Sequence, residues 1–123
     1  MRILLVEDNE TFREIFKGEL LAQCPAAVVK EAASGEEALR EIDGFSPEIV
    51  FMDLHLPGEN GLQLTKKIKG RFPDVRIAIL TSYDLPEYRQ AAVQSGAERY
   101  FVKDAFSRAE IEGFIHGDHG DPA

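Results

Sequence analysis

The chain has 123 residues, of which 44% are hydrophobic and 29% charged, and its 14 Lys and Arg against 22 Asp and Glu give a formal net charge of −8. These values describe one globular domain with a real core, and the acidic balance argues against nucleic acid as its ligand. A single cysteine, Cys24, excludes an internal disulfide, and no apolar run is long enough for a membrane span or a signal-peptide core. We therefore expect a cytoplasmic domain with no membrane contact.

Apolar runs and helical periods alternate along the chain. Strands are predicted at residues 3–6, 26–31, 48–52, 76–80 and 99–102. Helices are predicted at 10–22, from 35, at 61–71, after 84 and after 107. The first helix has an apolar stripe formed by Phe12, Ile15, Phe16 and Leu20.

Capping signals mark three of the helix starts. Ser34 and Ser107 each stand three residues before a glutamate, which is the capping-box pattern. Asp84 is expected to cap the fourth helix, and Gly96 to follow its last turn.

Five strand–helix units predict a parallel sheet covered on both faces. We expect a flavodoxin-like, doubly wound α/β fold with strand order 2-1-3-4-5 and five helices, in which the carboxyl ends of strands 1, 3, 4 and 5 converge. The residues at those ends are Glu7, Asp8, Asp53, Thr81 and Lys103.

These residue types complement one another chemically. Three carboxylates in one pocket repel each other, and a hard cation such as Mg²⁺ or Mn²⁺ would neutralise them. A carboxylate such as Asp53 can act as a nucleophile toward phosphorus, and Lys103 and Thr81 could contact the transferred phosphoryl group. Each residue alone has a simpler interpretation as a turn residue, helix-terminal acid or solvated charge. Their occurrence together at successive strand ends is what indicates a site.

Over residues 1–116 the chain resembles the receiver domain of two-component response regulators. The resemblance rests on the acid pair after strand 1, on Asp53 with Pro57 and Gly61 at the family's spacing, on Thr81 with the serine that follows it, and on Lys103 after strand 5. It implies that Asp53 accepts a phosphoryl group from a sensor histidine kinase or a histidine phosphotransfer protein.

The same resemblance implies further roles. Thr81 and Tyr100 would form a switch pair. The resemblance also implies that Mg²⁺ is held by Glu7, Asp8, Asp53 and the main-chain carbonyl of His55.

One position departs from the common pattern of the family. Asp104 follows Lys103 where many receivers have proline, and this Lys-Asp-Ala sequence is similar to receivers that precede a LuxR-type helix-turn-helix domain, which implies a role in transcription regulation. Residues 117–123 are predicted to be a disordered tail or the start of a linker. We assign no function to His116 and His119.

Three other functions stay open on the sequence alone. A flavodoxin-like cofactor binder would need a phosphate-binding loop where this chain has Glu7 and Asp8. A phosphatase or phosphotransferase with an Asp nucleophile would usually have a second carboxylate where His55 stands. A receiver-like module that is never phosphorylated would not need the complete set of acids, threonine and lysine.

Two further expectations concern regulation. His55 and Tyr83, two residues after Asp53 and Thr81 respectively, are expected to set the dephosphorylation rate. The surface of the fourth helix, fifth strand and fifth helix is expected to change its contacts with a partner or output domain. Homodimers are expected through that surface or through the first and fifth helices.

Overall fold

Five parallel strands form one sheet in the order β2-β1-β3-β4-β5, which confirms the predicted order. The structure is a computed structural model that describes residues 1–117. Its strands are β1 (Arg2–Val6), β2 (Val28–Ala32), β3 (Ile49–Asp53), β4 (Arg76–Thr81) and β5 (Arg99–Val102). The tail prediction, including His119, falls mainly outside the described residues.

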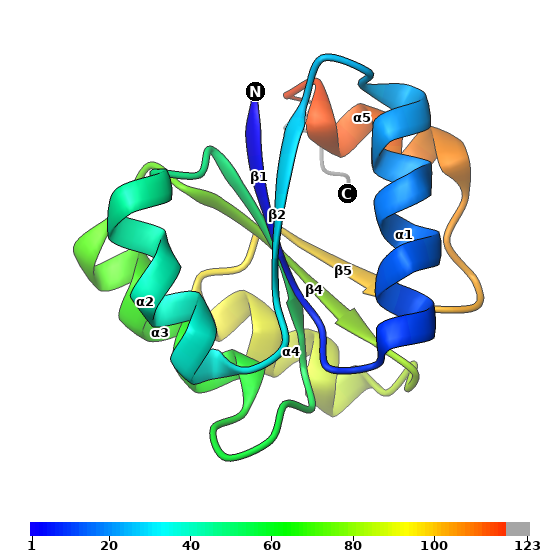
Figure 1. Cartoon of the computed structure of the whole chain (residues 1–123). Helices are drawn as coiled ribbons and strands as arrows, with labels where there is room; N and C mark the ends of the chain where they lie inside the picture. Colours follow the sequence, from blue (N-terminus) through cyan, green and yellow to red (C-terminus); the bar gives the residue numbers. More distant parts are fainter. Residues whose placement is uncertain (118–123) are drawn as a thin grey trace.

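The helices cover the two faces of the sheet unequally. α1 and α5 pack on one face, and α2, α3 and α4 pack on the other (Figure 1). Among the described residues, no helix is long and apolar enough to cross a membrane. The helices are α1 (Glu10–Gln23), α2 (Gly35–Phe45), α3 (Gly61–Arg71), α4 (Pro86–Ser95) and α5 (Arg108–Ile115).

The strand register brings the predicted site residues to one edge. Val6 pairs with Met52, so the next residue of each segment, Glu7 and Asp53, reaches the same level of the sheet. Thr81 pairs with Val102. All five residues of β3 are buried, because apolar cores lie on both faces of this central strand. A rigid, fully covered strand therefore ends in the Asp53 carboxylate.

Some local predictions were wrong. β2 begins two residues later than predicted and extends to Ala32, and Ile15 is 62% exposed rather than part of the buried α1 stripe. Leu85, not Asp84, is the N-cap residue of α4. Pro86 decides this start, because proline is favoured at the first helical position and holds the residue before it extended. The Asp84 carboxylate instead pairs with Arg89.

The two predicted capping boxes have different outcomes. The box at Ser107 is complete and confirms the prediction. Ser34 accepts a hydrogen bond from the Glu37 N–H, but the Glu37 carboxylate accepts from the N–H of Ala33 instead of that of Ser34. The sequence pattern therefore predicted the start of α2 correctly and one of its two hydrogen bonds.

Gly61 gives a test of the close packing beneath the site. A Cβ at this first residue of α3 would lie 2.2 Å from the Asp53 carbonyl oxygen, a backbone atom that cannot easily yield. We expect Gly61→Ala to lower the free energy of unfolding by on the order of 2 kcal/mol. Gly70→Ala on the same helix is the control, because nothing lies within 4 Å of its Cβ. It should be neutral or stabilising by up to about 1 kcal/mol, measured by urea denaturation. Equal stability of the two variants would contradict this account.

Candidate phosphoacceptor and metal site

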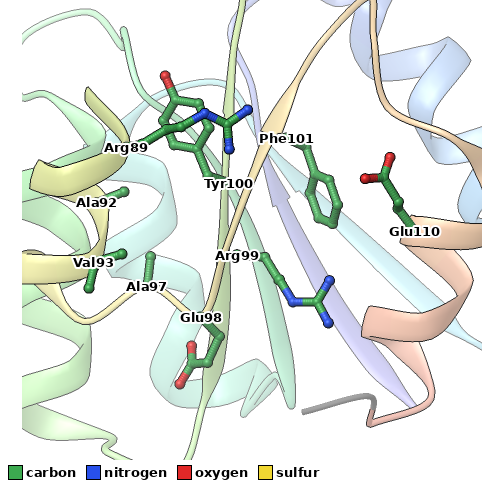
Figure 2. Close-up of a pocket in the computed structure, with 9 residues that line it drawn as sticks. All are labelled: Arg89, Ala92, Val93, Ala97, Glu98, Arg99, Tyr100, Phe101 and Glu110. Carbon is green, nitrogen blue, oxygen red and sulfur yellow. The ribbon is translucent and has the colours of Figure 1, made fainter. Parts of the chain in front are cut away.

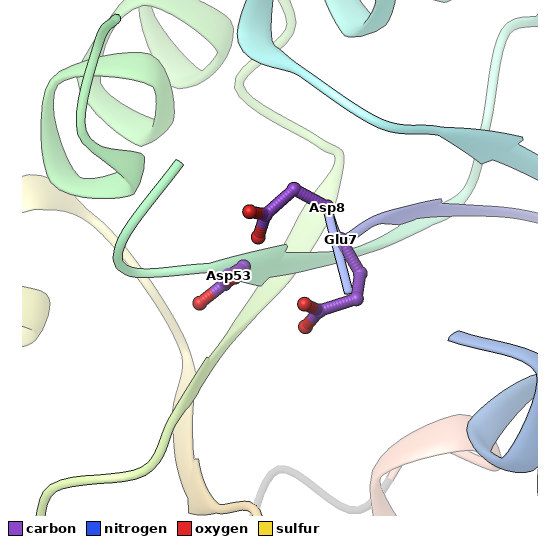
Figure 3. A group of neighbouring side chains, drawn as sticks. All are labelled: Glu7, Asp8 and Asp53. Atoms are coloured by element: carbon purple, nitrogen blue, oxygen red, sulfur yellow. The ribbon is translucent and has the colours of Figure 1, made fainter. Parts of the chain in front are cut away.

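Three carboxylates converge at the carboxyl edge of the sheet. Glu7 and Asp8 follow β1, Asp53 ends β3, and one carboxylate oxygen of each lies within 4.8 Å of the others. Figure 3 shows the three side chains turned toward a common space. Glu7 is fully buried and Asp53 is 3% exposed, whereas Asp8 reaches solvent. The predicted acid cluster is therefore assembled in the fold.

Lys103 supplies the cation that compensates part of this charge. Its Nζ lies 2.8 Å from Glu7 Oε1 and 3.5 Å from Asp53 Oδ2. The lysine is fixed at the end of β5 by its own N–H, which donates to the Thr81 carbonyl at 2.7 Å. The ammonium also lies 4.8 Å from the centre of the Phe12 ring, on the α1 side of the sheet. One ammonium thus pairs with two of the three carboxylates in the cluster.

The electrostatics of the site favour a proton or a further cation at Asp53. Burial of the carboxyl, together with the charge of Glu7, raises the pKa of Asp53 from 3.8 to about 7, although Lys103 and the His55 N–H oppose the change. That N–H donates to Asp53 Oδ1 at 3.1 Å. In the absence of a metal ion, the Asp53 carboxyl therefore binds a proton up to about pH 7, whereas in water it would already be ionised there.

The donor set fits Mg²⁺. Carboxylate oxygens are the ligands that this hard cation prefers. Glu7 Oε1, buried and close to Lys103, has no hydrogen-bond partner among the described residues and is paired by charge alone. The solvent-facing Asp8 leaves the cluster open to water molecules, which Mg²⁺ usually retains.

Thr81, Tyr83 and Tyr100 form a short chain of contacts beside the acids. Thr81 is buried at the end of β4, and its hydroxyl oxygen accepts a hydrogen bond from the Tyr83 N–H at 3.2 Å. The Tyr100 hydroxyl donates to the Tyr83 carbonyl at 2.6 Å. Burial raises the pKa of the Tyr100 hydroxyl. The loop after Thr81 therefore links the two residues predicted to be a switch pair.

β5 presents different residues to the two faces of the sheet, because successive side chains of a strand alternate. Tyr100 packs against the core beneath α2, α3 and α4, whereas Phe101 packs with the α1 and α5 core, the side that also holds the Lys103 ammonium. The Arg89 guanidinium carbon lies 4.8 Å from the centre of the Tyr100 ring.

Next to Tyr100, a pocket of about 360 Å³ opens between α4 and α5 (Figure 2). Its lining residues are Arg89, Ala92, Val93, Ala97, Glu98, Arg99, Tyr100, Phe101 and Glu110. The walls carry charges of both signs, and Val93 is 71% exposed.

The structure brings His55 and Tyr83 together, with ring centres 5.3 Å apart. Sequence reasoning missed two neighbours. Tyr88 contacts both of these rings, and Arg89 covers Tyr100. Both residues lie near the start of α4. The sequence predicted that they belong to this helix, but a position on a helix does not specify which loop its side chain contacts.

Comparison with known proteins establishes the family. Residues 3–115 match the response regulator receiver domain, and the chain belongs to this family of signalling domains. Such receivers act in two-component systems with a phosphodonor kinase and bind Mg²⁺ at an acidic pocket.

Curated relatives add a narrower context. The chain is 40% identical over 104 residues to the uncharacterized transcriptional regulatory protein YhcZ of Bacillus subtilis, covering 85% of this chain and 49% of YhcZ. It is also 40% identical over 106 residues to the oxygen regulatory protein NreC of Staphylococcus carnosus, covering 85% of this chain and 49% of NreC. The chain thus spans about half the length of these relatives.

Solved structures agree with this family. A LuxR-family response regulator from Aurantimonas sp. SI85-9A1 superposes with a TM-score of 0.85 at 34% identity, covering 96% of this chain and 84% of that one. The receiver domain of a putative NarL from Mycobacterium tuberculosis gives a TM-score of 0.83 at 27% identity, covering 96% and 94% respectively.

The raised pKa of Asp53 predicts how stability depends on pH without metal. The folded protein binds the Asp53 proton more tightly than the unfolded chain, so this carboxyl favours folding below about pH 4, and the contribution is lost as pH rises toward about 7. In EDTA, Asp53→Asn should therefore be more stable than the parent at pH 8, by up to about 4 kcal/mol, and the difference should shrink toward pH 4.

Urea denaturation at several pH values measures this difference. Asp43→Asn is the matched control, because it removes an exposed carboxylate of α2 that lies outside the acid cluster. A constant difference between Asp53→Asn and the parent from pH 4 to 8 would contradict the account of the charge cluster.

Proposed function

We propose that Asp53 accepts a phosphoryl group from a phosphohistidine of a sensor histidine kinase or a histidine phosphotransfer protein. The observation that carries this proposal is the convergence of Asp53, two further acids and the Lys103 ammonium at the end of a fully buried central strand. Membership of the receiver family supports it, and also favours it over a cofactor-binding role on the same fold.

In the proposed transfer, an Asp53 oxygen forms a bond to phosphorus while the bond from phosphorus to the donor imidazole nitrogen breaks. The electron pair of that bond stays on the imidazole. The Lys103 ammonium, already 3.5 Å from Asp53 Oδ2, pairs with a phosphoryl oxygen, and the Thr81 hydroxyl donates a hydrogen bond to another. His55 N–H continues to hold the carboxyl of Asp53 in place.

We assign the Mg²⁺ ligands to Glu7, Asp8, Asp53 and the main-chain carbonyl of His55, with Mn²⁺ as a substitute. When bound, the cation would neutralise charge on the acids and on the incoming phosphoryl oxygens. The outward-facing side chains of His55 and Tyr83 are proposed to set how fast the phosphorylated form is hydrolysed, since both lie next to residues that would contact the phosphoryl group.

Phosphodonor labelling tests the acceptor. With Mg²⁺ and acetyl phosphate, the parent should gain the mass of one phosphoryl group, and Asp53→Asn should lose this gain because the amide is not a nucleophile toward phosphorus. Intact-protein mass spectrometry measures both. Asp43→Asn, which removes an exposed carboxylate on α2, should label as the parent does. Full labelling of Asp53→Asn would show that another residue is the acceptor.

We further propose that Thr81 and Tyr100 report phosphorylation to the surface of α4, β5 and α5. Movement of the Thr81 hydroxyl toward a phosphoryl oxygen would break its bond to the Tyr83 N–H, and the Tyr83 carbonyl is the acceptor of the Tyr100 hydroxyl. A change at Thr81 can thereby reach Tyr100 through Tyr83, beside the direct contact between the Thr81 side chain and the Tyr100 hydroxyl. Tyr100 lines the pocket between α4 and α5. A partner or a second copy bound there would contact a surface that changes with phosphorylation.

Thr81→Ala tests this coupling. The variant should still be labelled at Asp53 but should lose most of the phosphorylation-dependent NMR shifts at Tyr100, because the hydroxyl that moves is gone. Thr11→Ala is the control, since it removes an exposed hydroxyl on α1. Shifts at Tyr100 that match the parent's in Thr81→Ala would rule out this route.

The wider role follows from the relatives. We propose that the chain is the receiver part of a cytoplasmic transcription regulator with a LuxR-type output domain, because its curated relatives are named as transcriptional regulatory proteins and are about twice its length. In this role the receiver itself binds no DNA, consistent with its net charge of −8. It would form homodimers through α4, β5 and α5, or through α1 and α5.

A further inference from the structure

Three aromatic side chains from different segments meet outside the strand ends. His55 follows β3, Tyr83 follows β4, and Tyr88 lies in the first turns of α4. Their ring centres are 5.3 Å (His55–Tyr83), 5.8 Å (His55–Tyr88) and 6.2 Å (Tyr83–Tyr88) apart, all with edge-to-face geometry. We call these three residues the ring cluster. Edge-to-face contact is a favourable arrangement for aromatic pairs, so the rings restrain each other.

Two members of the ring cluster are tied to the phosphoacceptor site by their backbones. The His55 N–H donates to Asp53 Oδ1, and the Tyr83 N–H donates to Thr81 Oγ1. Their side chains, however, are exposed, Tyr83 by 53%. An exposed ring stays in one position only if a contact compensates for its lost rotamer freedom.

Tyr88 differs from His55 and Tyr83 because its side chain is partly buried. It packs against the core beneath α2, α3 and α4. It is therefore the member of the ring cluster that the fold fixes, and it contacts both exposed rings at once.

We propose that Tyr88 is a positioning residue that slows hydrolysis of the aspartyl-phosphate by holding the rings of His55 and Tyr83 over it; this inference rests on the proposed phosphorylation of Asp53. In hydrolysis, a water oxygen bonds to phosphorus and the bond from phosphorus to the Asp53 oxygen breaks. The electron pair returns to the carboxylate, a water proton passes to solvent, and inorganic phosphate leaves. The attacking and leaving oxygens are roughly in line, so water must arrive from the side away from Asp53.

The position of the ring cluster fits this path. Both exposed rings belong to residues two positions beyond the strand ends, and the backbone N–H groups of these residues bind the Asp53 carboxyl and the Thr81 hydroxyl. Because Tyr88 belongs to α4, a partner that displaces this helix would also loosen the two rings. The lifetime of the phosphorylated form then depends on what binds α4.

The test measures decay of the phosphorylated protein. Parent and variants are labelled with acetyl phosphate and Mg²⁺, the donor is removed, and the phosphorylated fraction is followed by intact mass. Tyr88→Leu removes the ring but keeps apolar volume in the core, and it should shorten the half-life about two- to tenfold, as loss of aromatic pair contacts allows. Tyr88→Phe keeps the ring and should decay as the parent does. Gln94→Ala, an exposed change on the same helix outside the pocket between α4 and α5, should also match the parent.

A double variant that lacks both exposed rings separates a positioning role of Tyr88 from a general effect of the substitution on α4. In the double variant His55→Ala/Tyr83→Ala, adding Tyr88→Leu should change nothing, because the rings through which Tyr88 acts are absent. Melting temperatures check the fold, and Tyr88→Met provides the same comparison if the leucine variant unfolds.

Two results would overturn the inference while leaving the proposed function intact. One is a Tyr88→Leu half-life equal to or longer than the parent's. The other is faster decay caused by Tyr88→Leu even in the double-variant background. A parent protein that gains no phosphoryl group would instead overturn the proposed function, and this inference with it.

Discussion

Repulsion among carboxylates at one end of a parallel sheet is the constraint on which the rest of the site depends. Glu7 and Asp53 are buried side by side, and burial of like charges is unfavourable unless a cation or a proton compensates for it. Lys103 supplies one cation from the neighbouring side, held there by β5. The negative charge that Lys103 does not compensate makes the pocket suited to a metal ion and to the phosphoryl chemistry of its family.

This charge cluster needs a rigid support, and the sheet provides it. β3 is covered by apolar cores on both faces, and the close approach of Gly61 to the Asp53 carbonyl packs α3 directly against its end. The unfavourable electrostatics are therefore offset by apolar burial elsewhere in the domain. A similar separation of roles is seen along β5, where alternate residues face different cores and the strand ends in a charged group.

The sequence predicted the parts of this arrangement that depend on strand ends. Apolar runs located β3 and β5, and the parallel order then required Glu7, Asp53, Thr81 and Lys103 to meet. The start of α4 was predicted incorrectly because two signals compete there. Asp84 is a good N-cap residue, but Pro86 fixes the helix start one residue further on and leaves the Asp84 carboxylate to pair with Arg89.

Contacts between loops could not be predicted, for a physical reason. Whether Tyr88 touches His55 depends on how α4 is rotated and how far it lies from the loop after β3, and neither periodicity nor propensity determines these quantities. The helix itself has no side-chain cap at its start, so its position depends on packing and on the pair between Asp84 and Arg89. Arg89 also covers Tyr100, and Tyr88 contacts the rings near Asp53. Neighbouring residues of α4 thus contact both the rings near Asp53 and the ring of Tyr100, which makes α4 the element through which the acid cluster and the pocket beside Tyr100 can influence each other.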